Sequence, residues 1–75
     1  MSKMIKSVDE LKRGDIVVYR NGRINYVNRP IKYANWFKED FKSLESPLLD
    51  IVEVKRYVKI LWFYKLKTIY KRKEN

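Results

Sequence analysis

The sequence predicts a mainly β protein, a small barrel of about five strands with one short helix. Two observations favour this fold class. Residues 15–28 combine strand-forming side chains with a strong turn signal, and residues 52–66 alternate between apolar and charged side chains. A chain of 75 residues is long enough for one domain, 1–75, with one small core. Closing the sheet into a barrel would hide its edges.

The N-terminal segment predicts a helical turn followed by a strand. Ser7 and Glu10 have the spacing of a capping box, in which each side chain accepts a hydrogen bond from the backbone of the other end. Gly14 is expected to end this turn. Residues 15–20 follow as a strand because they are rich in isoleucine, valine and tyrosine.

The dipeptide Asn21-Gly22 predicts a hairpin, since a two-residue type I′ turn needs positive φ at both positions. Residues 23–28 would form the return strand. A turn of this length places Arg20 directly opposite Arg23, and like charges in that position repel each other. Either both side chains point to solvent, or the loop is longer than two residues. If the two arginines converge, they could bind an anion together.

The middle of the chain permits two interpretations. Pro30 ends the return strand because it has no amide hydrogen to donate. Within 31–46 the aromatic residues have spacings closer to a helix than to a strand. This predicts a two-turn helix over 36–44 with Asn35 as its N-cap. Short strand pieces within a long loop are the alternative.

The C-terminal third predicts β structure. Seven of the eight even positions from 52 to 66 are apolar, whereas the odd positions are rich in charge. That alternation favours a half-buried strand, and the many β-branched residues favour it over the competing helix. The run is too long for one ordinary strand, so a bend is expected near 56–59 or 65–67. A last strand would cover 67–73.

The apolar run Ile60–Tyr64 is expected to lie on this long strand with both of its faces apolar. Alternation would turn Leu61 and Phe63 away from the inner face, which would carry Val58, Ile60, Trp62 and Tyr64. The two outward side chains, beside Tyr57, then need cover from residues 31–46 or from a protein interface. The core is expected to contain most of a set of seven large aromatics, which are Tyr19, Tyr26, Tyr33, Trp36, Phe37, Trp62 and Tyr64.

Positive charge is concentrated at the C-terminal end. Residues 55–75 carry eight basic side chains and one acidic one, in a chain whose net charge is +9. Such a segment favours a polyanionic partner, and rows of lysine on a strand contact phosphates without reading sequence. The alternative is that these lysines only keep an edge strand soluble. The candidate polyanion-binding residues are Lys55, Arg56, Lys59, Lys65, Lys67, Lys71 and Arg72.

Several function classes are disfavoured by composition. The chain has no cysteine and no histidine, so it offers neither a disulfide, a thiolate metal site nor an imidazole base. We therefore expect no metal, no cofactor and no enzymatic activity. The longest apolar run is far too short for a membrane span or a secretory signal. These features predict a cytoplasmic protein that does not bind membranes.

Three parts of the chain resemble known proteins. Lys12–Gly22 resembles the opening strand of SH3-like, KOW-type β-barrels. Together with Asp50–Arg56 and Thr68–Arg72 it is similar to small phage and prophage accessory proteins of Gram-positive bacteria. The resemblance implies an SH3-like barrel in a bacterial host, and a role in nucleic-acid binding or counter-defence. It assigns no functional residue.

These observations give two functional hypotheses. The first is a non-enzymatic accessory protein whose basic, aromatic-rich C-terminal half binds nucleic acid or a nucleoprotein complex. Inhibition of a host defence nuclease, for example a CRISPR effector, fits this description. The alternative is a protein-interaction or homo-oligomeric assembly module that uses the apolar strand 60–64, with Tyr57, Leu61 and Phe63 at the interface.

Overall fold

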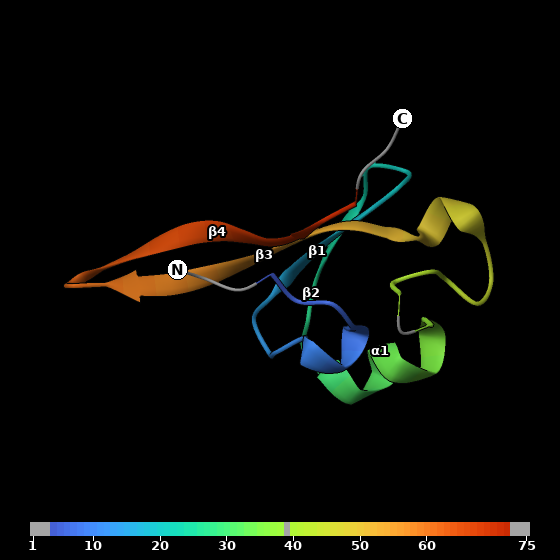
Figure 1. The fold of residues 1–75 in the computed structure, drawn as a ribbon, viewed down its shortest axis with the longest axis horizontal. Coiled ribbons are helices and arrows are strands. Elements are labelled where there is room, and N and C mark those ends of the chain that lie inside the picture. Colours follow the sequence, from blue (N-terminus) through green and yellow to red (C-terminus); the bar gives the residue numbers. More distant parts are fainter. Residues whose placement is uncertain (1–3, 39, 73–75) are drawn as a thin grey trace.

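The computed structural model describes residues 4–38 and 40–72. Its strands form one antiparallel sheet in the order β2-β1-β3-β4 (Figure 1). The strands are β1 (Ile16–Tyr19), β2 (Ile24–Tyr26), β3 (Ile51–Ile60) and β4 (Phe63–Lys71). The helical elements are α1 (Pro30–Trp36) and the 3-10 turns η1 (Val8–Glu10) and η2 (Pro47–Leu49).

The mainly β class with one short α-helix is confirmed, but the expected strand count is wrong. The described residues contain four strands rather than five. The sheet is open, with β2 and β4 at its two edges, so a closed barrel is not confirmed. Helix α1 has seven residues, and no helix in the described part of the chain has the length and apolarity to cross a membrane.

The predicted capping box is present at η1. Ser7 Oγ accepts a hydrogen bond from the Asp9 amide at 3.2 Å, and the Glu10 carboxylate accepts one from the Ser7 amide at 3.1 Å. Gly14 follows with φ of +94°, a conformation that glycine adopts without strain. The chain then enters β1.

The β1–β2 hairpin forms where Asn21-Gly22 predicted it, through a three-residue loop. Tyr19 donates its amide to the Arg23 carbonyl at 2.8 Å, and its carbonyl accepts from the Gly22 amide at 2.9 Å. Gly22 has φ of +88°, as the third loop residue of this hairpin type requires. The longer loop resolves the expected repulsion, because Arg20 lies in the loop and does not oppose Arg23.

The predicted helix over 36–44 is wrong, because α1 ends at Trp36. Pro30 does not merely end a strand: it occupies the first turn of the helix, where a missing amide hydrogen costs nothing. The helix cannot extend to Phe41, whose φ is +70°. The described residues after α1 form an irregular loop with one isolated bridge, Phe37 to Ser43, close to the alternative interpretation.

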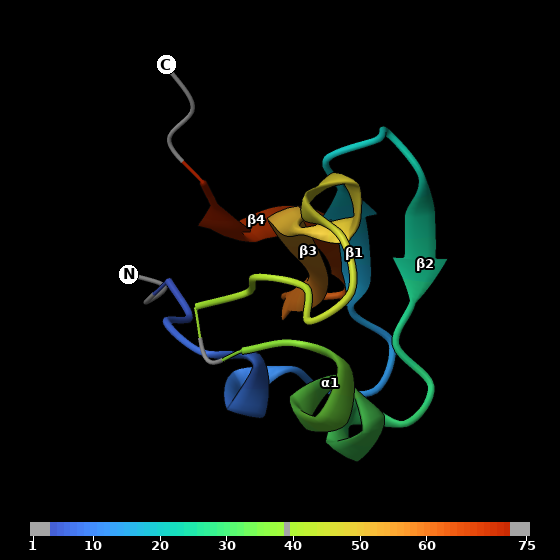
Figure 2. The ribbon, with the colours of Figure 1, turned by 90° about the vertical axis from the view of Figure 1, so that its right-hand side faces the viewer.

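The core lies on one face of the sheet, which carries Val17 and Val54. Figure 2 shows η1 and α1 side by side, away from the strands, and the loop after α1 runs between them and the sheet. Tyr19, Phe37 and Tyr33 stack in a row with ring centroids 6.2 and 5.8 Å apart. The expected aromatic core is therefore only partly right: four of its members are exposed, namely Tyr26, Trp36, Trp62 and Tyr64.

The bend expected within the run 52–66 is present, but its expected position is wrong. The chain turns at Leu61 and Trp62, and neither predicted bend marks that position. A two-residue turn reverses the alternation, so Phe63 lies opposite Ile60 and shares its face, while Tyr64 moves to the other face. The last strand begins at Phe63 and includes the predicted 67–71; the expected end at Lys73 lies outside the described residues.

Candidate nucleic-acid interface

The C-terminal hairpin projects from the body of the protein. Strand β1 pairs with β3 only as far as Ile16 opposite Lys55. Beyond that point, β3 and β4 pair with each other from Arg56–Lys67 to Ile60–Phe63. We call residues 56–67 the arm; Figure 1 shows it extending away from α1 and η1 to a free end. Its side chains are exposed on both faces except for Arg56 and Val58, which are half-buried.

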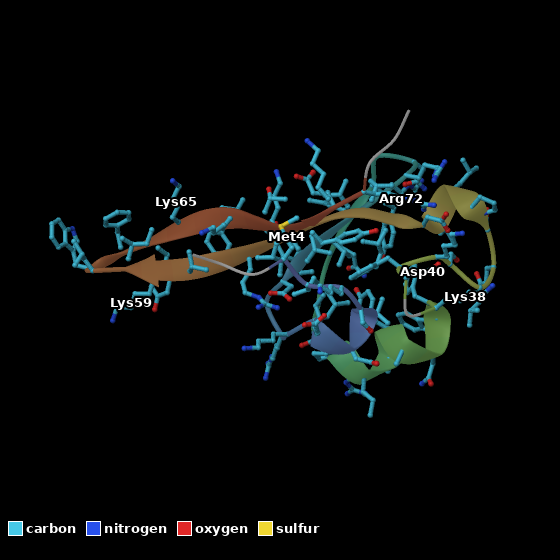
Figure 3. All side chains as sticks on the ribbon, in the orientation of Figure 1. Met4, Lys38, Asp40, Lys59, Lys65 and Arg72 are labelled. Carbon is cyan, nitrogen blue, oxygen red and sulfur yellow. The ribbon has the colours of Figure 1, made fainter. Side chains whose placement is uncertain are left out.

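The register divides the arm and its base into two faces, because directly paired residues share a face. The first, which we call the tyrosine face, carries Lys55, Tyr57, Lys59, Tyr64, Leu66 and Thr68. The second, which we call the phenylalanine face, carries Arg56, Val58, Ile60, Phe63, Lys65 and Lys67. Figure 3 shows Lys59 and Lys65 extending from the arm in opposite directions.

The tip of the arm is apolar and exposed. Leu61 is 76% exposed and Trp62 is 83% exposed. The Trp62 ring meets Phe63 edge to face, with centroids 6.1 Å apart. Leu61 has φ of +56°, which a side chain with a β-carbon rarely adopts. The arm thus presents a strained apolar turn.

Three lysines of the arm are available for an anionic ligand. Lys59, Lys65 and Lys67 are exposed, and none forms an ion pair with another residue of the described chain. Lys65 and Lys67 follow each other on one face, whereas Lys59 lies on the other, opposite Tyr64. Cations are therefore present on both sides of the arm.

Arg56 has a structural partner. Its Nε and Nη2 atoms donate hydrogen bonds of 2.8 Å to the two oxygens of the buried Asp15 carboxylate, and Nη2 also donates to the Glu10 carbonyl at 3.0 Å. The hydrogen bond to Asp15 is the main reason that the pKa of Arg56 lies above its ordinary value. The guanidinium is thus directed toward the start of β1 and not toward a ligand.

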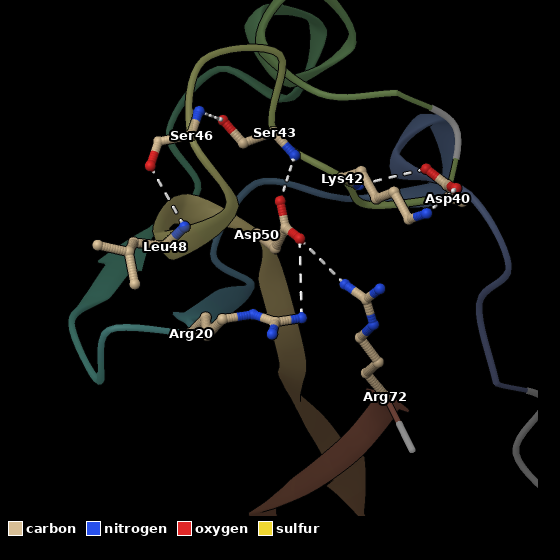
Figure 4. Close-up of polar contacts among 8 residues, drawn as sticks. All are labelled: Arg20, Asp40, Lys42, Ser43, Ser46, Leu48, Asp50 and Arg72. Carbon is tan, nitrogen blue, oxygen red and sulfur yellow. Dashed lines mark hydrogen bonds and ion pairs between the residues drawn. The ribbon is translucent and has the colours of Figure 1, made fainter. Parts of the chain in front are cut away.

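Arg72 is occupied in the same way at the other end of the sheet. Its Nη1 donates to the buried Asp50 carboxylate at 3.2 Å, and Arg20 lies 3.8 Å from the same oxygen (Figure 4). The second Asp50 oxygen accepts from the Ser43 amide at 2.8 Å. Asp50 therefore joins the hairpin loop, the loop after α1 and the end of β4. The anion that Arg20 contacts is a carboxylate of the protein itself.

The remaining two predicted cations lie on the main sheet. Lys55 is half-buried and opens the tyrosine face next to Thr68. Lys71 is exposed and lies opposite Glu53. The structure thus assembles a basic arm from the lysines, whereas Arg56 and Arg72 hold the body of the fold together.

The three residues predicted for a protein interface do not form one patch. Phe63 lies on the phenylalanine face, Tyr57 on the tyrosine face and Leu61 at the tip. The expected cover by residues 31–46 is wrong, because that segment packs around the core at the far side of the body from the arm tip (Figure 1). All three side chains are exposed.

Sequence reasoning missed Trp62 and Tyr64 as surface residues, since it treated them as core. The exposed Ile60–Tyr64 run contained a signal that it folds apart from the core: five consecutive apolar residues cannot all face one small interior.

Elsewhere, the described residues contain no group of three acidic side chains that could hold a metal ion.

A hollow lies between β2 and α1. It is lined mainly by Tyr19, Ile24, Trp36, Phe37 and Leu49, and its volume is about 560 Å³. Beside it, the Tyr33 hydroxyl accepts a hydrogen bond of 2.9 Å from Asn25 Nδ2. Burial raises the pKa of Tyr33, so this hydroxyl stays protonated well into the alkaline range. The groove carries one base and one acid, Arg23 and Glu45, on its rim.

Comparison of the chain with protein-family models, curated proteins and solved structures gives no significant match.

Proposed function

We propose that this chain is a non-enzymatic binding protein that holds nucleic acid, alone or within a nucleoprotein complex, against its C-terminal arm. The observation that carries this proposal is the arm itself, a projecting ribbon with three lysines free of internal ion pairs among the described residues and with exposed aromatic side chains between them. Phosphate contacts from lysine supply affinity without sequence preference.

The shape of the arm supports a polyanion over a small acidic ligand. Successive side chains on one strand face lie about 6.6–6.8 Å apart, so the lysines form a row and not a cluster. Lys65 and Lys67 form such a row on one face, and Lys55 and Lys59 form the ends of another on the opposite face. A row of separated positive charges fits a chain of phosphates better than it fits a single small anion.

The test is nucleic-acid binding as a function of salt, measured by fluorescence anisotropy. About four to six neutralised phosphates give a log–log slope of roughly −3 to −5. Replacing Lys59, Lys65 and Lys67 with glutamine should weaken binding to every sequence and flatten the slope. A matched control replaces Lys6, Lys12 and Lys38, which are exposed on the body, and should change the slope less. No binding at low salt would remove the proposal.

A second candidate is an assembly module, favoured by the exposed tip of Leu61, Trp62 and Phe63. Contiguous apolar side chains on a projecting turn are typical of surfaces that become covered. Light scattering coupled to size-exclusion chromatography measures the mass of the protein. If the tip joins subunits, Phe63→Ser should lower the mass of the particle in solution from that of an oligomer to that of one chain, while circular dichroism shows an intact fold. A monomeric wild-type protein in nuclease-treated lysate would contradict self-assembly.

The resemblance noted in the sequence extends the first proposal. It favours an SH3-like accessory protein of a mobile element, acting in the bacterial cytoplasm against a defence nuclease. Adding the protein to a cleavage reaction of a purified CRISPR effector tests this extension. Inhibition by the wild-type protein that is lost in the lysine-to-glutamine variant would support it. If several effectors each cleave their target fully in the presence of an excess of this protein, the extension is wrong.

A further inference from the structure

The two faces of the arm differ in the chemistry they offer. On the tyrosine face, β3 presents Lys55, Tyr57 and Lys59 at successive positions, so an aromatic ring stands between two cations. On β4, Tyr64 lies directly opposite Lys59. Tyr57 and Tyr64 are diagonal neighbours, whose Cβ atoms are about 7–8 Å apart or slightly closer in such pairs. Both rings are more than half exposed.

This face continues into the main sheet on the side opposite the core. Ile16 pairs with both Tyr26 and Lys55, so these three residues form one row across β2, β1 and β3. Ile16 is 8% exposed yet lies outside the core cluster, as expected if its neighbours in this row cover it. A third exposed tyrosine, Tyr26, therefore shares the surface with Tyr57 and Tyr64.

From this arrangement we infer that the tyrosine face binds unpaired bases, so that the ligand is a single-stranded nucleic acid or a single-stranded segment of a larger one. Tyr57 and Tyr64 stack on neighbouring bases, and Lys55 and Lys59 contact the phosphates between them. This inference rests on the proposed function and adds the class of nucleic acid and the face that recognises it.

The exposure of the rings favours single strands over duplexes. In a duplex, neighbouring bases cover the flat faces on which a tyrosine would stack. An unpaired base leaves its face free, and aromatic platforms flanked by cations are the usual means of binding single strands without sequence preference. The flanking lysines also favour this ligand over an apolar protein surface, which would leave Lys55 and Lys59 without a charged partner.

The test compares single-stranded and double-stranded oligonucleotides of one sequence, as DNA and as RNA, by anisotropy at low salt. Loss of one stacking ring weakens single-strand binding by about 5- to 150-fold. We expect Tyr57→Ala and Tyr64→Ala each to reach that range for single strands, with little change for the duplex. Tyr57→Phe should keep the affinity because it keeps the ring.

Matched controls come from the other face of the same arm. Val58→Ala and Ile60→Ala remove apolar atoms from strand positions on the phenylalanine face, and they should leave single-strand affinity within a few fold of wild type. The salt slope of the tyrosine variants should equal that of wild type, because no phosphate contact is lost. Circular dichroism of each variant checks that the fold is intact.

The outcomes separate this inference from the proposed function. If wild-type protein binds duplex as tightly as single strands, or if the tyrosine variants bind as wild type, the face assignment is wrong while nucleic-acid binding stands. If wild type binds no oligonucleotide, both are wrong. A last measurement uses vesicles containing phosphatidylserine. Binding to vesicles without binding to single strands would identify the ligand as an anionic membrane and overturn the inference.

Discussion

The Arg56 guanidinium binds the Asp15 carboxylate side on, with two hydrogen bonds of 2.8 Å. Asp15 is buried at the start of β1, and its Oδ2 also accepts the Lys12 amide at 2.8 Å. One ion pair thus fixes the turn that precedes β1 to the position on β3 where the arm begins. The basic residue that sequence reasoning assigned to a ligand anchors the arm to the body.

The first prediction concerns this ion pair. Arg56→Ala should lower the free energy of unfolding by about 3–5 kcal/mol, because it leaves a buried carboxylate without its counter-ion. Lys67→Ala is the matched control, since Lys67 lies opposite Arg56 but is exposed; its effect should stay within about 0.5 kcal/mol. Urea unfolding followed by circular dichroism measures both. Equal effects would show that the Asp15 pair does not stabilise the fold.

The second prediction concerns alkaline pH. Burial raises the pKa of Tyr33 above that of an unfolded tyrosine, about 10. The unfolded chain therefore loses this proton at lower pH than the folded chain. Stability from Tyr33 is fully present below pH about 10 and decreases as pH rises above it. Urea unfolding between about pH 8 and 11 measures this decrease. The free energy of unfolding should fall less steeply with pH in Tyr33→Phe than in wild type, and Tyr64→Phe, at an exposed position, is the control.

Much of the N-terminal half could be predicted because its signals are local. The capping box at Ser7 and the hairpin at Gly22 depend on residues within four positions of each other. The length of the hairpin loop was not predictable from Asn21-Gly22 alone, since glycine at positive φ serves both two-residue and three-residue loops. The repulsion between Arg20 and Arg23 was the observation that favoured the longer loop.

The arm could not be predicted because its turn lacks turn residues. Leu61 and Trp62 are apolar, and the even positions stay apolar on both sides of them, so the period does not mark where the chain reverses. A pattern with period two predicts a strand but not the position where the chain reverses. After a two-residue turn, the side chains lie on the face opposite to the one that continued alternation predicts. The exposure of Trp62 depends on the same reversal, which carries it away from the core.

The third prediction concerns the β1–β2 loop. Gly22 has φ of +88°, and an added β-carbon would meet no atom within 4 Å. Any cost of substitution therefore comes from the backbone conformation and not from a clash. Gly22→Val should lower the free energy of unfolding by about 1 kcal/mol or more, whereas Gly22→Asn should cost less because asparagine tolerates this region. Equal losses for valine and asparagine would contradict the φ argument.

The last prediction concerns the strain at the arm tip. Leu61 combines positive φ with 76% exposure, so it contributes little burial while its backbone costs about 1–2 kcal/mol relative to the ordinary region. Leu61→Asn should therefore raise the free energy of unfolding relative to Leu61→Ala by about 1 kcal/mol, because both remove the apolar side chain and only asparagine tolerates positive φ. Urea unfolding of the two variants at equal m-value measures the difference. If a ligand or second subunit covers the tip, both variants should also bind it more weakly than wild type. Leu61→Asn would then be more stable than Leu61→Ala although neither variant binds normally. Equal stability of the two variants would show that the turn carries no strain, and the exposed leucine would then be explained by its contacts alone.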